Sequence, residues 1–188
     1  MAEQTIEMTF RTVLWQQFGA AIDMLENALL ACPASLWRER LWSAPSDHSQ
    51  SPEDAAFWSL TYHTLFWLDL YLTGSHEGFA PPAPFINALD PASVFPEQPY
   101  TKDELHGYLV HLRKKCQTTI AELTDEKAYQ PFTFPWPGGT SISFLELQLY
   151  TMRHVQEHAA QLSLFLGQHG TPDEALDWVE RAQEGAGL

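Results

Sequence analysis

The sequence predicts an all-α fold: a four-helix bundle with long crossover connections and a short additional helix near the C-terminus. Four long segments repeat apolar residues at steps of three and four, the period of a helix buried along one face. Capping residues mark several helix starts, and a proline-rich stretch separates the second segment from the third. With 188 residues, 45% of them hydrophobic, the chain is long enough for a core without disulfides, so we expect one domain over residues 1–188.

The first helix is expected over about residues 9–31, ending before Pro33, with a further helical turn over residues 35–40. Residues 43–50 are polar and predict a loop. The apolar stripe of this helix consists of Phe10, Leu14, Phe18, Ala21, Leu25 and Ala28.

The second helix is expected to begin at residues 51–54, where Ser51 is the N-cap and Pro52 the first helical residue, and to end at Gly74. It is apolar all round, so we expect it to be central in the bundle or covered by a second subunit, which favours a homodimer. It is shorter than the roughly 20 apolar residues of a membrane span and contains both Asp69 and His63, so we do not expect it to cross a membrane.

Residues 75–100 are rich in proline and predict a crossover without regular structure that packs along the bundle or frames a site. A capping box of Thr101 and Glu104 opens the third helix. Its stripe is Leu105, Leu109, Leu112, Cys116, Ile120 and Leu123.

Residues 131–140, PFTFPWPGGT, predict an extended or hairpin-like aromatic loop. A capping box of Ser143 and Glu146 opens the fourth helix, which ends at Gly167 or Gly170, and residues 171–174 cap the short C-terminal helix. The expected core stripe of the fourth helix is Leu145, Leu149, Met152, Val155, Ala159, Leu162 and Leu166.

The composition argues against several classes of partner and location. A net charge of −14 repels phosphate backbones and anionic membranes, so we expect neither nucleic-acid nor membrane binding. Cys32 and Cys116 form no CxxC motif, and no secretory signal opens the chain, so we expect no disulfide framework and a cytoplasmic location.

Three histidines are the candidate functional residues. His63 lies in the apolar second helix, and His154 and His158 lie four residues apart in the fourth, on a ridge that is polar in its middle and apolar at its ends. Three neutral imidazoles suit zinc, nickel, copper or iron and leave a position open. Such an ion keeps its full charge and can lower the pKa of a coordinated water or thiol. The alternative is that His63 bonds to a backbone carbonyl and that the pair is half exposed.

The other candidates are weaker. His48, His76, His106, His111 and His169 have no partner at ligand spacing and are expected on the surface. No catalytic residue can be named, and the aromatic loop around Trp136 is either a lid or structural packing. Residues that could orient the imidazoles or a water are Ser59, Tyr150, Thr151, Glu157 and Gln161.

The segments FWSLTYHTLFWLDLYL and LYTMRHVQEHAAQLSLFL, together with the helix order and the long crossover, resemble the DinB-like superfamily of helical-bundle proteins. That resemblance implies that His63, His154 and His158 bind a divalent metal, with zinc or nickel expected before iron or manganese. Members include metal-dependent hydrolase-like proteins and thiol S-transferases. The resemblance covers nearly the whole chain.

Two functions follow. In the first, an open metal site activates a thiol or water to attack a small electrophilic substrate, although no carboxylate at a motif-defined place supplies a general base. In the alternative, the bundle is non-catalytic and has a structural metal, for which Cys116 would be the natural fourth ligand, or it binds a protein partner without any metal.

Overall fold

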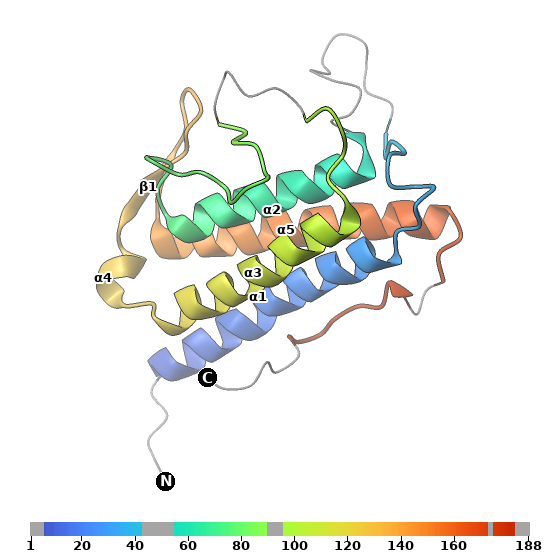
Figure 1. Cartoon of the computed structure of the whole chain (residues 1–188). Helices are drawn as coiled ribbons and strands as arrows, with labels where there is room; N and C mark the ends of the chain where they lie inside the picture. The colour runs from blue at the N-terminus through green and yellow to red at the C-terminus, as the bar shows by residue number, and fades with distance from the viewer. Residues whose placement is uncertain (1–5, 43–54, 90–95, 173–174, 183–188) are drawn as a thin grey trace.

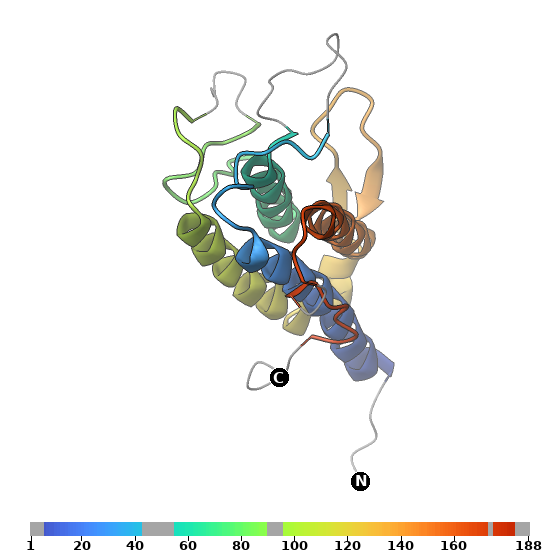
Figure 2. The same cartoon turned by 90° about the vertical axis from the view of Figure 1, so that its right-hand side faces the viewer.

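The computed structural model describes residues 6–42, 55–89, 96–172 and 175–182. Four long helices dominate these residues: α1 (Ile6–Ala31), α2 (Phe57–Thr73), α3 (Lys102–Ala121) and α5 (Phe144–Gln168). The short helix α4 (Asp125–Ala128) and a hairpin of β1 (Pro131–Thr133) and β2 (Ser141–Ser143) join α3 to α5. Figures 1 and 2 show α2 and α5 side by side, with α1 packed on α5 and α3, and α3 also against α2. The prediction of an all-α bundle is confirmed.

The first helix has the expected end at Ala31, and its stripe is buried from Leu14 onward. Phe10 was expected in the core but is 41% exposed, because the N-terminal turns of α1 extend beyond the other helices (Figure 2). Residues 35–40 form no helix either. They make successive turns, with the amides of Leu36 and Glu39 donating to carbonyls three residues earlier.

Helix α2 begins at Phe57, later than expected, and the predicted cap at residues 51–54 lies outside the described residues. The backbone of Ala56 is extended because it pairs antiparallel with Arg40, and Phe57 N donates to Glu39 O at 3.0 Å. The predicted stop at Gly74 is confirmed. Its φ of 76° suits glycine, and a Cβ there would lie 2.7 Å from the Phe144 ring.

The outer side of α2 is covered by the crossover between α2 and α3, which has no regular structure in its described part, as predicted. Phe85 of this segment stacks on Tyr62 of α2 and on Tyr108 of α3, with ring centroids 5.8 and 4.5 Å apart. Tyr62 Oη donates to the carbonyl of Ile86, whose amide donates to Tyr100 Oη. Burial of α2 on both sides is therefore achieved within one chain and does not require a second subunit.

The capping box of Thr101 and Glu104 is present, and the predicted stripe of α3 is buried throughout. Ser143 caps α5 by accepting from Glu146 N at 3.2 Å. The core face of the first turns of α5 differs from the prediction, because Leu149 is 41% exposed whereas Leu147 is fully buried. These turns face a second small core made with the hairpin, containing Leu70, Tyr71, Leu123, Ala128, Phe132, Phe134, Phe144 and Leu147.

The predicted short C-terminal helix is wrong for the part of this segment that the structure describes. Residues 175–182 contain bends and a single 3₁₀ position, and α5 is the last α-helix among the described residues. A helix this short is marginal by itself. The segment is hydrogen-bonded to α1 instead, with Ala182 N donating to Gln16 O at 2.9 Å. The Ala182 side chain packs against Gly19 so closely that a Cβ at position 19 would clash with it.

A buried polar network joins α2 to α3. The carboxylate of Asp69, 4% exposed, accepts from Tyr108 Oη at 2.6 Å and from Lys115 Nζ at 2.6 Å. Lys115 also donates to Thr73 Oγ1 and to the backbone carbonyl of Asp69. Burial and the nearby carboxylate raise the pKa of Tyr108, so this hydroxyl stays protonated and donates.

None of the helices described combines the length and the apolar character that a membrane crossing requires.

Candidate metal centre

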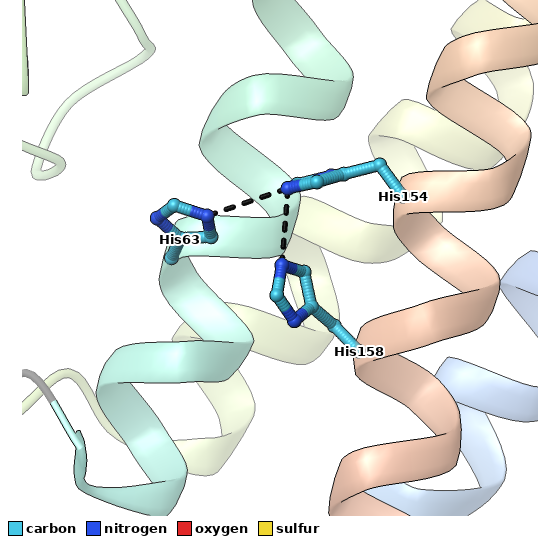
Figure 3. A group of neighbouring side chains, drawn as sticks. All are labelled: His63, His154 and His158. Atoms are coloured by element: carbon cyan, nitrogen blue, oxygen red, sulfur yellow. Dashed lines mark hydrogen bonds between the residues drawn. The ribbon is translucent and has the colours of Figure 1, made fainter.

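The three candidate histidines meet between α2 and α5. His63 lies in the middle of α2, and His154 and His158 lie one turn apart on the facing side of α5 (Figure 3). Nε2 of His154 is 3.3 Å from Nε2 of His63 and 3.0 Å from Nε2 of His158. Three nitrogens bound to one tetrahedral zinc at about 2.1 Å would lie about 3.4 Å apart, so the spacing fits a single small ion.

The hydrogens of these rings cannot satisfy both contacts. A neutral imidazole has one N–H, and His158 Nδ1 is 2.8 Å from the acceptor Gln161 Oε1, so the Nε2 of His158 presents a lone pair. If His154 Nε2 carries a hydrogen, it can donate to only one neighbour. If it does not, it faces the His158 lone pair directly. At least one contact is therefore unsatisfied, and a cation at the centre would satisfy all three nitrogens.

Desolvation keeps the rings of His63 and His154 neutral. Desolvation, followed by the electrostatic effect of His158, lowers the pKa of His63 to about 4. Desolvation and then the other two rings lower the pKa of His154 to about 3. Neutral imidazole is the form that binds metals. The His63 side chain is nevertheless solvent-exposed and the other two are half-buried, so the cluster opens to solvent on the α2 side.

The surroundings of the rings only partly match the sequence-based candidates. Gln161 orients His158, as expected, and Tyr150 stacks parallel to His154 at 6.5 Å between centroids. Thr151 instead donates to the carbonyl of Leu147, and Glu157 lines a different surface pocket together with Gln17 and Trp178. The Nδ1 of His154 is buried and has no hydrogen-bond partner among the described residues.

In the part of the chain that the structure describes, no fourth protein ligand joins the cluster. Among the described residues, the group with ligand geometry contains His63, His154 and His158 without a cysteine or carboxylate. Cys116 is fully buried in α3, and burial raises its thiol pKa; burial also raises the pKa of Cys32 to about 12. Both cysteines are therefore protonated in the metal-free protein, and neither belongs to the described group with ligand geometry.

The other described histidines stand apart from this cluster. His76, His111 and His169 are exposed, as predicted, whereas His48 lies outside the described residues. His106 is half-buried, and its Nε2 is 2.7 Å from Glu26 Oε1, a partner that spacing along the chain does not show because the glutamate lies in α1.

Sequence reasoning did not include Trp67 among the residues expected around the site. It lies one turn from His63, and the two rings are 6.2 Å apart. Its indole also meets Trp136 from the hairpin at 6.1 Å, so the aromatic loop does approach the histidines. The signal in the sequence was the four-residue spacing of Trp67 from His63, which places both on one helix face.

A comparison with curated proteins finds no match. A family model described as the DinB superfamily matches residues 17–162, a range that includes all four long helices in part or whole and the three clustered histidines. With most of its length matched, the chain belongs to the DinB superfamily.

Proposed function

We propose that this protein is a metal-dependent enzyme in which His63, His154 and His158 hold one divalent ion, with zinc or nickel ahead of iron or manganese. The observation that carries the proposal is the convergence of three Nε2 atoms that their own hydrogens cannot satisfy. The absence of a cysteine or carboxylate from the described cluster favours an open site over a closed structural one.

When bound, the ion would supply Lewis acidity that lowers the pKa of a coordinated thiol or water, suited to thiol transfer or hydrolysis of a small electrophilic substrate. The chain's own residues position this chemistry. Gln161 holds the His158 ring by its Nδ1, and the parallel ring of Tyr150 packs beside His154. The exposed edge at His63 gives a small substrate access.

Elemental analysis of untagged protein purified without chelator tests the proposal. We expect close to one equivalent of zinc, nickel, iron or manganese in the wild type and none in the His154→Ala/His158→Ala variant. His111→Ala is the matched control, because this exposed histidine lies on α3 outside the cluster and should leave the metal content unchanged. A metal-free wild type that also refuses added divalent ions would contradict the proposal.

The alternative is a non-catalytic bundle with a structural metal or a protein-interaction role. A structural metal would give the same metal content as the proposed enzyme but a different coordination sphere. A cobalt-substituted protein with an open site should change its visible spectrum when small thiols are added, whereas a closed site should not respond. A responsive site would justify a screen of thiols with hydrolysable esters and amides.

A further inference from the structure

A set of aromatic side chains lies beside the histidine cluster on the side of the hairpin. We call it the aromatic wall, and it consists of Trp67 of α2, Phe134 and Trp136 of the hairpin loop, and Tyr150 of α5. Trp67 follows His63 by four residues and Tyr150 precedes His154 by four. The end of α2 meets the start of α5, since Gln148 Nε2 donates to Tyr71 O, so the two helices run antiparallel here. Both rings therefore lie one turn from the histidines in the same direction.

The ring contacts continue without interruption from the histidines to the hairpin. Trp67 contacts His63 at 6.2 Å and Trp136 at 6.1 Å. Trp136 stacks on Phe134 at 4.5 Å, Phe134 meets Tyr150 at 5.1 Å, and Tyr150 stacks on His154. Structural packing alone would bury such rings, yet Trp136 is 43% exposed. Trp136 is thus partly exposed to solvent, and it lies two ring contacts away from His63.

From this arrangement we propose that the ligand of this site joins an anionic metal-binding group to a flat apolar group, which stacks on Trp136 with the Trp67 indole at its edge. The inference rests on the proposed function, because the anionic group needs the ion. Three neutral imidazoles leave the ion its full positive charge, which attracts a thiolate, hydroxamate or carboxylate. The same charge repels a cation from the neighbouring rings, so a neutral aromatic group is a better occupant of the wall than an ammonium group. Offset stacking rewards a planar partner over an aliphatic one.

Three hydroxamic acids test the proposal, because they share one metal-binding group and differ in the group attached to it. Zinc-loaded protein is titrated by calorimetry with the benzo-, cyclohexanecarbo- and acetohydroxamic acids. We expect benzohydroxamic acid to bind roughly three- to tenfold more tightly than acetohydroxamic acid, with the cyclohexane compound between them. The ratio of the affinity for benzohydroxamic acid to that for acetohydroxamic acid should fall to about one in Trp136→Ala. Part of this preference should remain in Trp136→Phe.

Trp42→Ala is the matched control. The exposed fraction of Trp42, 44%, is close to that of Trp136. Trp42 lies far from the aromatic wall along α2, because it follows the antiparallel pairing of Arg40 with Ala56 at the opposite end of this helix. This variant should keep the full preference. The zinc content of every variant is measured in parallel.

The outcomes separate the two proposals. Equal affinities of the wild type for the three acids, or a preference that survives Trp136→Ala, would overturn the aromatic-wall proposal while the metal site stands. A wild type that binds neither zinc nor any hydroxamate would overturn both. A preference lost in Trp136→Ala at full zinc content, and kept in Trp42→Ala, would support the wall as the specificity element.

Discussion

Helix α2 carries one polar cluster toward α5 and another toward α3, and the two differ in how their polar atoms are satisfied. Around Asp69, both carboxylate oxygens have donors, and those donors are protein groups held within the bundle. Around His63, three ring nitrogens converge with too few hydrogens, and one edge is open to solvent. A satisfied buried network fastens helices together, whereas convergent lone pairs at an open edge indicate a site for a ligand from outside.

The largest effect on stability is expected from Asp69→Ala. This change leaves the buried Tyr108 hydroxyl and the Lys115 ammonium without their carboxylate, and we expect the free energy of unfolding to fall by about 3 kcal/mol. Chemical denaturation followed by circular dichroism measures this loss. Metal content should stay at the wild-type level, and a loss of metal would show that the two clusters are one coupled unit.

Zinc should stabilise the wild type by a similar amount. At a free concentration 100 times its Kd, zinc is expected to raise the free energy of unfolding by about 2.7 kcal/mol. His63→Leu should abolish this gain but change the metal-free stability by no more than about 0.5 kcal/mol, since the side chain is exposed.

The Asp69→Ala variant is the control for the zinc effect, because it should gain the same increment from a lower starting point. Should His63→Leu keep the response to zinc, His63 would not be a ligand.

Tyr108→Phe is a smaller change to the Asp69 network than Asp69→Ala. It removes one hydrogen bond to a carboxylate that retains Lys115, and we expect a loss of about 1.5 kcal/mol in denaturation experiments. Tyr129→Phe, at an 81% exposed position, is the matched control and should be neutral. Equal stability of the two variants would mean that the Asp69 network contributes little.

The smallest effect is expected from Gln161→Leu. Without the amide oxygen, the His158 ring loses the contact that orients it, and the metal affinity should fall about tenfold in a competition with a chelating dye. Gln156→Leu serves as the control, because Gln156 faces α1 and its Nε2 contacts Met24 Sδ. An unchanged affinity for Gln161→Leu would show that packing alone orients the ring.

The sequence by itself determined the features that depend on local periodicity and capping. The four helices, the Thr101 capping box, the stop at Gly74 and the aromatic hairpin follow from residues close together along the chain, and the structure has them all. His154 and His158 belong to the same class, because residues four apart on a helix always share a face. The place of His63 beside them came from the family resemblance and from the rarity of an imidazole in an apolar helix.

Tertiary structure alone decided which side of each helix is covered and how far. Phe10 and Leu149 fit their apolar stripes but are exposed. Phe10 is exposed because the other helices end before the N-terminal turns of α1, and Leu149 because the first turns of α5 face the hairpin core through Leu147 instead. Residues 175–182 bond along α1 because backbone groups of that helix lie within reach only once the bundle has formed. The partners of Asp69 and the contact of Trp136 with Trp67 join residues far apart in the chain, and no local pattern encodes such distances.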